Sequence, residues 1–301
     1  MTNCPPDSFP GGLVHAGHYE NFPVASFVLP RRLRAPIRAI YAFARAADDI
    51  ADEGEASPDE RWAGLAWFYA RLDRIEAGET PDDPIFAPLA ATIRTHALPL
   101  RPFRDLLDAF SQDIDKHRYA DFGELMQYCR KSANPVGRLL LHLFGDTDPR
   151  HQAWSDGICS SLQIINLLQD IEIDYRKGRV YLPADEMARF GVTEAHIASG
   201  RSDTAWQGLM QHQIERARRM LAAGAPLGKA LPGRIGLEMR LIVLGGERIL
   251  ARLHEARGDV FRQRPRLGPA DWLHLFRRAL WPGRRRAATR TCGGCGGGAC
   301  R

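Results

Sequence analysis

The chain lacks any long apolar run, and no stretch approaches the roughly 18 apolar residues that a membrane-spanning helix needs. Its first residues lack the basic stretch and apolar stretch of a secretory signal peptide. Segments that alternate polar and apolar residues, as surface strands do, are also scarce. Hydrophobic residues make up 45% of the chain and charged residues 26%, as in a soluble globular protein. We therefore expect a cytoplasmic protein built almost entirely of helices.

Cysteine is too scarce and too unevenly placed to form a disulfide framework. Two of the six cysteines, Cys129 and Cys159, fall in apolar helical segments and are predicted to be buried thiols. Three others lie within residues 292–300 and invite a zinc site, but no histidine follows His274 to complete one. Glycine is so frequent there that disorder is the favoured interpretation.

Basic charge is concentrated at the C-terminus. The net charge is +5, yet residues 262–301 contain ten arginines and one acid, a balance of +9, so the rest of the chain carries −4. No nucleic-acid recognition motif accompanies these arginines, so no nucleic-acid partner is expected. A helix near 270–281 is predicted to have one apolar side made of Trp272, Leu273, Leu275, Phe276, Leu280 and Trp281.

That segment, with Arg277, Arg278 and residues 284–286, predicts peripheral contact with an anionic membrane surface on the inner face of the plasma membrane. The alternative is that Trp272 and Phe276 pack onto the helical domain.

Helical periodicity organises most of the remaining chain. Pro36 is predicted to open a helix that ends near Gly54. Further helices are predicted near 59–77, 85–97, 102–116, 121–143 with a kink or division at Asn134-Pro135, 149–175, 184–190, 193–199, 203–223 and 230–257. We divide the chain into an N-terminal tail (1–14), one all-α domain (15–260), a basic amphipathic segment (261–282) and a disordered tail (283–301).

Two acidic stripes carry the strongest functional signal. Offsets of 0, 4, 7 and 11 residues stay on one face of a helix. In the first stripe they align Tyr41, Arg45, Asp48 and Asp52, and in the second, offsets of 0, 3, 7 and 11 align Gln163, Asn166, Asp170 and Asp174. Carboxylates in apolar helices are costly unless they are paired or bind metal. Two facing stripes offer the oxygen ligands that suit Mg²⁺ carrying a substrate's phosphates.

Neighbouring charges have simpler interpretations. Asp49, Glu53 and Glu55 are interpreted as a solvated helix end. Arg45 is suited to neutralising a diphosphate leaving group, although an i,i+3 pair with Asp48 is the alternative. Arg179 follows the second stripe closely, so it is a candidate diphosphate ligand, with a solvated helix end as its alternative.

The chain resembles the squalene and phytoene synthase family over roughly residues 15–260. The resemblance is carried by five ordered blocks: Asn21-Phe-Pro-Val-Ala-Ser26, Tyr41 to Asp52, Tyr128-Cys-Arg-Lys-Ser-Ala-Asn-Pro-Val-Gly137, Gln163 to Asp174, and Gly178-Arg-Val-Tyr-Leu-Pro183. It implies an all-α isoprenoid synthase fold around a central substrate cavity. It also implies a prenyl diphosphate substrate.

The resemblance also implies roles for single residues. The metal–diphosphate residues are Asp48, Asp52, Asn166, Asp170 and Asp174, with Mg²⁺ as the cofactor. Arg45 and Ser26 match diphosphate contacts, whereas Val24 stands where many members have a second serine. Tyr128 and Gly137 match a bent helix beside the carbocation. We expect Tyr41 and Tyr128 to stabilise that cation through their aromatic faces.

Within the family, the residues of the first and third blocks are most similar to those of the hydroxysqualene synthases of bacterial hopanoid pathways. The other enzymes of those pathways are candidate partners. This similarity implies conversion of presqualene diphosphate to hydroxysqualene, with no NADPH, and no dinucleotide fingerprint is visible. Condensation of two farnesyl diphosphates to presqualene diphosphate or squalene is one alternative, and phytoene synthesis is another. A non-catalytic assembly factor of the same fold is disfavoured, since such relatives lose the aspartates that this chain keeps.

Overall fold

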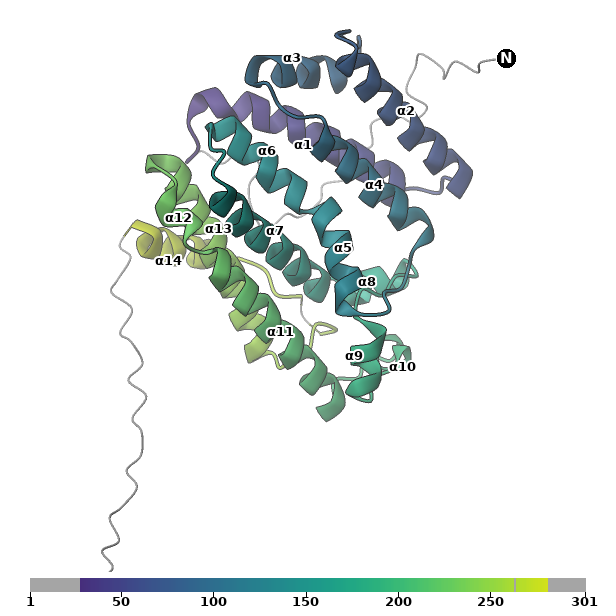
Figure 1. Ribbon diagram of the computed structural model, residues 1–301. Helices are drawn as coiled ribbons and strands as arrows, with labels where there is room; N and C mark the ends of the chain where they lie inside the picture. Colours follow the sequence, from purple (N-terminus) through teal and green to yellow (C-terminus); the bar gives the residue numbers. More distant parts are fainter. Residues whose placement is uncertain (1–27, 263, 281–301) are drawn as a thin grey trace, which may run out of the picture.

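Helices dominate the part of the chain that the computed structural model describes, residues 28–262 and 264–280 (Figure 1). No strand forms within that part, where one isolated bridge joins Arg118 to Val180. The helices are α1 (Arg31–Asp52), α2 (Pro58–Glu76), α3 (Phe86–His96), α4 (Arg101–Asp115), α5 (Phe122–Ser132), α6 (Asn134–Phe144), α7 (Pro149–Gln169), α8 (Ile171–Arg176), α9 (Ala184–Arg189), α10 (Glu194–Ala198), α11 (Thr204–Gly224), α12 (Leu227–Ala230), α13 (Gly233–Glu255) and α14 (Pro269–Leu280). The all-α prediction is confirmed.

Helix α7 is the centre of the packing. It contacts α5, α6, α11, α12 and α13, while α1 contacts α2, α3, α4 and α6 (Figure 1). Helices α8 to α10 lie together at one end of the molecule, next to the start of α11 (Figure 1). The second acidic stripe therefore begins on a helix that is fixed from several sides.

An aromatic cluster holds α1 in place. The ring of Phe43 lies 5.6 Å from that of Phe68, 5.7 Å from Phe86 and 5.4 Å from Phe103. Such tilted and edge-to-face pairs add to the stabilisation from burial. Ala47 continues this buried face and directly precedes Asp48, so the cluster determines where the first acidic stripe points.

Two helix boundaries differ from the predicted ones, and one predicted division is confirmed. Helix α1 begins at Arg31, so Pro36 lies inside it rather than at its start. The segment 121–143 is divided at Ala133 into α5 and α6, as the Asn-Pro pair predicts. The expected 149–175 helix is interrupted at Asp170, whose ψ of 8° ends α7, although Asp174 N–H still donates to the carbonyl of Asp170 at 2.8 Å. The chain therefore bends within the second stripe.

Helix α14 is amphipathic, but the prediction of one apolar side is wrong. Leu275 is fully buried against the core, whereas Leu273 is 68% and Leu280 65% exposed. Residues two apart on a helix point to nearly opposite faces, which separates Leu273 from Leu275. Trp272 and Phe276 are partly buried against the core, as the alternative interpretation holds. Trp281 and residues 284–286 lie outside the described residues.

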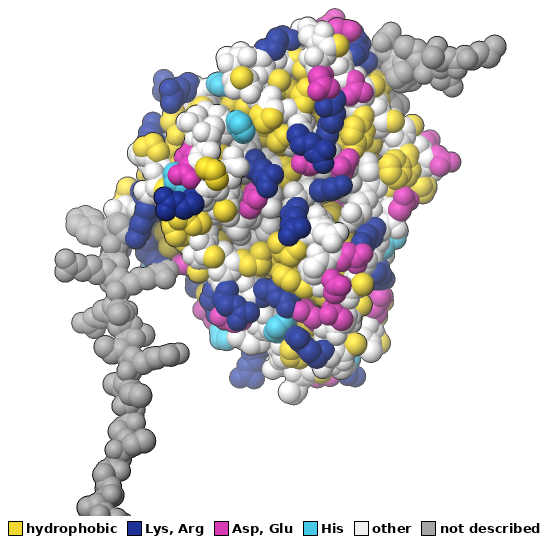
Figure 2. Space-filling model, viewed as in Figure 1, with side chains coloured by type: hydrophobic (Ala, Val, Ile, Leu, Met, Phe, Trp, Pro, Cys, Tyr) yellow, Lys and Arg dark blue, Asp and Glu magenta, His cyan; other side chains and the backbone are white. Residues whose placement is uncertain are grey.

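The molecular surface mixes charges of both signs. On the face drawn in Figure 2, Lys and Arg side chains are interspersed with Asp and Glu. Across residues 28–262 and 264–280, no helix is both long and apolar enough to cross a membrane.

Candidate active site

The first stripe lies near the C-terminal end of α1. Arg45 donates to the carboxylate of Asp48 at 2.8 Å and also pairs with Asp49. The i,i+3 pair considered as the simpler role of Arg45 is therefore present. Asp49 forms an ion pair with Arg45 rather than being merely solvated, which corrects the interpretation of this helix end. Tyr41 is half-buried on the same helix, and Ser26 lies outside the described residues.

Two basic residues connect the second stripe's segment to the first stripe. Lys177 Nζ lies 2.5 Å from a carboxylate oxygen of Asp52 and 3.1 Å from one of Glu53. The Arg179 guanidinium pairs with the other carboxylate oxygen of Asp52. Glu53 is thus part of an ion-pair group as well, which corrects its interpretation. The fold brings the end of α1 against the turn that follows α8, although more than a hundred residues separate them.

The carboxylates of the second stripe are held differently from one another. Arg264 binds Asp170 through two nitrogens, with Nε–Oδ1 at 2.5 Å and Nη2–Oδ2 at 3.1 Å. Within the described residues, the Asp174 carboxylate has no ion pair or hydrogen bond. Asn166 is exposed one turn before Asp170. Asp174 is therefore the member of the stripe whose charge is least compensated.

The carboxylates of both stripes share one electrostatic environment. Burial raises the pKa of Asp174 to about 8, and repulsion by Asp170 and Asp52 adds to the shift. Burial also raises the pKa of Asp48 to about 6, with Asp52 and Asp49 adding to it and Arg45 opposing it. Burial acts on Asp52 too, but Lys177 and Arg179 outweigh it and lower the pKa of that carboxyl. Asp52 on α1 and Asp174 on α8 thus lie within electrostatic range of each other.

The donor set suits Mg²⁺ chemically, although it is not assembled as a tight cluster. Carboxylate and amide oxygens are the ligands that Mg²⁺ uses in proteins, usually with water and phosphate completing the shell. Among the described residues, no three His, Cys, Asp or Glu side chains lie close enough to share one ion. The Arg179 Nε atom is buried without a hydrogen-bond partner. Both features suit a site whose remaining ligands come from a phosphorylated substrate.

A tyrosine cluster lies beside this site. Tyr128 donates from its hydroxyl to Asp113 Oδ2 at 2.9 Å, and Tyr181 donates to Asp113 Oδ1 at 3.3 Å. The Tyr128 ring lies 5.7 Å from the rings of Tyr119 and Tyr181, which stack on each other at 5.5 Å. Arg179 donates to the Asp113 carbonyl at 3.2 Å and so connects this cluster to Asp52.

Sequence reasoning missed four of these residues. Asp113 has a local signal, because it follows Ala109 and Phe110 at helical spacing on the buried face of α4. Tyr119, Tyr181 and Arg264 lie outside helices and have no periodic pattern that marks them.

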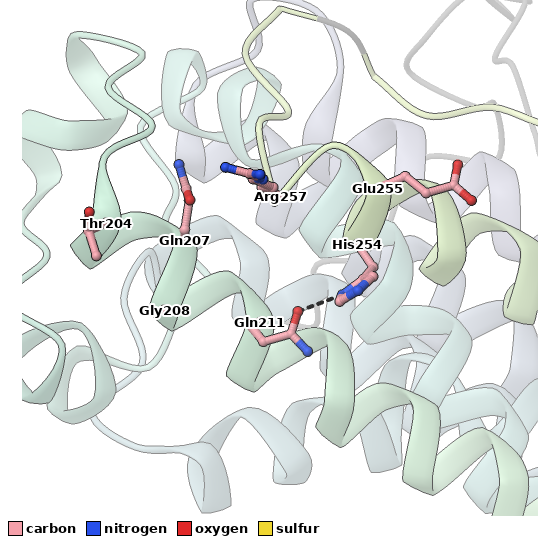
Figure 3. A pocket seen from close by; sticks show the side chains of 7 residues that line it. All are labelled: Thr204, Gln207, Gly208, Gln211, His254, Glu255 and Arg257. Carbon is pink, nitrogen blue, oxygen red and sulfur yellow. Dashed lines mark hydrogen bonds between the residues drawn. The ribbon is translucent and has the colours of Figure 1, made fainter.

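Two hollows lie away from this site. One, of about 530 Å³, lies between the start of α11 and the end of α13. Mostly polar residues line it, and His254 Nδ1 lies 2.7 Å from Gln211 Oε1 (Figure 3). The other, of about 720 Å³, lies between α11, α13 and α14. None of the predicted site residues lines either hollow.

Known proteins resemble the chain over most of its length. The squalene/phytoene synthase family matches residues 15–271. Hydroxysqualene synthases of Rhodopseudomonas palustris and Sinorhizobium fredii are 37% and 34% identical to it, each over 84% of this chain and 85% of theirs. The crystal structure of squalene synthase HpnC from Alicyclobacillus acidocaldarius superposes with a TM-score of 0.74 at 38% identity, over 80% of this chain and 90% of that one. The chain belongs to the squalene/phytoene synthase family.

Proposed function

We propose that the chain converts presqualene diphosphate to hydroxysqualene and releases diphosphate. The carbon–oxygen bond to the diphosphate breaks, and both of its electrons leave with the diphosphate. After rearrangement of the cyclopropylcarbinyl cation, a water lone pair forms the new carbon–oxygen bond, and the surplus proton passes to bulk water. Electrons balance without a reductant, so NADPH has no part in the proposal.

The observation that carries this proposal is the meeting of the two acidic stripes with four basic side chains. Asp48, Asp52, Asp170, Asp174 and Asn166 would hold Mg²⁺, which, when bound, neutralises charge on the departing diphosphate. Arg45, Lys177, Arg179 and Arg264 already lie on or beside these carboxylates. They are positioned to transfer their hydrogen bonds to phosphate oxygens, which accept charged donors strongly.

The choice of substrate within the family rests on the relatives. Proteins named hydroxysqualene synthase are 34–37% identical over 84% of the chain. A phytoene synthase of Synechococcus elongatus is 32% identical over 68% of it. The higher identity of the hydroxysqualene synthases supports presqualene diphosphate, and farnesyl diphosphate condensation and phytoene formation become outcomes of the test.

We also propose peripheral contact between α14 and an anionic membrane surface. Leu273, Arg277 and Leu280 follow one another at helical spacing, and all three are exposed. Arg278 is half-exposed and lies 3.4 Å from Glu247. A cation near an anionic leaflet contributes about 1 kcal/mol. A polyisoprenoid product must enter lipid, so membrane contact at this helix would let the product leave the protein directly into the bilayer.

The test is incubation of the purified protein with presqualene diphosphate, farnesyl diphosphate and the longer geranylgeranyl diphosphate in separate reactions, in water enriched in ¹⁸O. We expect diphosphate release and ¹⁸O-labelled hydroxysqualene by mass spectrometry with Mg²⁺, and neither after chelation. Asp48→Asn and Asp170→Asn should each lower turnover by about 100-fold or more, because each removes a metal ligand.

The matched control is Asp82→Asn, since Asp82 is an exposed acid in the loop before α3. It should retain full turnover. Formation of phytoene, or of presqualene diphosphate from farnesyl diphosphate alone, would show that the protein acts on a different substrate from the one proposed. Near-normal turnover of the Asp48 or Asp170 variant would reject the site itself.

A further inference from the structure

A buried carboxylate outside the acidic stripes has no part in the reaction described so far. Asp113 on α4 is only 5% exposed. Both of its carboxylate oxygens accept phenol hydroxyls, from Tyr128 and Tyr181. Among the described residues it forms no ion pair, because Arg179 donates to its backbone carbonyl instead. Burying a carboxylate without a directly paired cation is expensive.

The same burial that makes this arrangement costly also shifts the pKa of the Asp113 carboxyl. Burial raises the pKa of Asp113 to about 7, with Asp48 adding to the shift while Arg179 and the two phenols oppose it. A positive charge formed nearby stabilises the ionised carboxylate, and the carboxylate stabilises that charge in return. A prenyl diphosphate that loses its diphosphate creates such a charge.

The tyrosines that bind Asp113 also keep its carboxylate from direct contact with a substrate cation. A carboxylate that met a carbocation directly would be alkylated. Here Tyr128 and Tyr181 cover it, and with Tyr119 they form one contiguous group of rings. Aromatic faces attract cations without a readily alkylated atom. Phenols that donate to a carboxylate become more electron-rich, which strengthens that attraction.

We infer that Asp113 is a positioning residue that acts through Tyr128 and Tyr181. It orients both phenols and supplies the negative charge behind them while the substrate is cationic. Preorganised charge of this kind lowers the barrier because no reorganisation is needed when the cation forms. The inference rests on the proposed function, and it adds an acid outside the metal-binding stripes to the same reaction.

The test compares Asp113→Asn with the wild-type protein in kcat, KM for presqualene diphosphate, product distribution and Tm. Asn has the same size and removes a costly buried charge, but its amide nitrogen donates to one phenol oxygen instead of accepting that phenol's hydroxyl, so these effects oppose each other and Tm should change little. We expect KM to change by less than about threefold and kcat to fall by about 10- to 100-fold, a typical loss for one preorganised electrostatic group. Products formed by early loss of a proton from the cation should increase relative to hydroxysqualene.

Further variants separate this role from a structural one. In the Tyr128→Phe/Tyr181→Phe background, Asp113→Asn should lower kcat little further, because the phenols that transmit its effect are gone. Glu186→Gln removes an equally buried carboxylate, held by Gln213 and Arg216, and should lower Tm while keeping kcat and products.

Unchanged kcat in Asp113→Asn, a parallel fall of Tm and kcat, or fully additive losses in the triple variant would each overturn the inference. A wild-type protein that releases diphosphate from no prenyl diphosphate rejects the proposed function, and the inference with it. Wild-type turnover with an unaffected Asp113 variant rejects the inference alone.

Discussion

Single carboxylates in this protein differ sharply in how well their charge is compensated. Asp52 has two basic partners and a lowered pKa, whereas Asp174 has neither partner nor hydrogen bond within the described residues and a raised one. Both belong to the same predicted metal site. When no metal ion or diphosphate is bound, the carboxylates of this site repel one another. Binding of a divalent ion removes that repulsion, which makes the free energy of binding more favourable.

Replacing Asp174 by Asn should therefore stabilise the metal-free protein. In the unfolded chain this carboxyl ionises near pH 4, and in the folded protein its pKa is about 8. Between these values only the folded state retains the proton, so rising pH increasingly favours unfolding until about pH 8. We expect the Tm of Asp174→Asn to exceed that of wild type by a margin that widens over this range. Each kcal/mol of difference in the free energy of unfolding should raise Tm by about 2–4 °C.

Thermal unfolding followed by circular dichroism from about pH 5 to 8 measures this margin. Asp82→Asn, at an exposed acid, should show no margin. With Mg²⁺ and diphosphate the order should reverse, because only wild type gains stability from binding. A variant that is no more stable than wild type at any pH would contradict the repulsion.

At the scale of helices, close packing between α7 and α11 holds the second stripe in position. A Cβ atom added at Gly224 on α11 would lie 2.5 Å from the carbonyl oxygen of Trp154 and 2.6 Å from Ile158 Cγ1, both on α7. At Gly157 on α7, the nearest atom to an added Cβ would be the carbonyl oxygen of Met220, at an ordinary 3.6 Å. Gly224 thus sets the distance between the two helices, and Gly157 does not.

Gly224→Ala should destabilise the protein by about 1–3 kcal/mol, the usual cost of overpacking, because backbone atoms of α7 cannot rotate away. Gly157→Ala is the matched control and should be neutral or stabilising by up to about 1 kcal/mol, because alanine favours helices more than glycine does. Urea unfolding measures both. Equal stability of the two variants would show that α7 and α11 can separate at no cost.

At the scale of the whole molecule, α14 belongs to the folded domain as well as to the proposed membrane contact. Asp271 pairs with Arg248 at 2.9 Å and with Arg252 at 2.7 Å, and Leu275 is fully buried. Truncation after Arg266 would remove these interactions and expose the core. Point substitutions on the outer face of α14 are therefore the informative test of membrane binding.

The double substitution Leu273→Ser and Leu280→Ser should weaken binding to anionic vesicles by about tenfold or more, since each leucine contributes up to about 1.5–3 kcal/mol when it is buried in lipid. Both side chains are exposed, so Tm should not change. Sedimentation with vesicles measures binding, and high salt should weaken binding of the intact protein. Trp62→Ser, at a 42% exposed apolar side chain on α2, is the matched control. Equal sedimentation of the double variant and wild type would show that this face of α14 does not bind the membrane.

The sequence by itself determined the helices and the acidic stripes. Apolar spacing, together with turn residues such as Gly54 and Gly178, located the helices of the described chain to within a few residues, because local periodicity reflects local backbone geometry. Its errors were also local: Pro36 is tolerated inside α1, and α7 ends at Asp170. The family resemblance identified the aspartates, but periodicity alone had already aligned them.

Only the tertiary structure decided which charges meet. Arg264 reaches Asp170 across 94 positions and Arg179 reaches Asp52 across 127, and no local pattern encodes such distances. Asp113 became a candidate only when α4, α5 and the segment after α8 brought two phenols to its carboxylate. Helical periodicity fixes the face on which a side chain lies, whereas the partner that it faces depends on packing between helices that are remote in sequence.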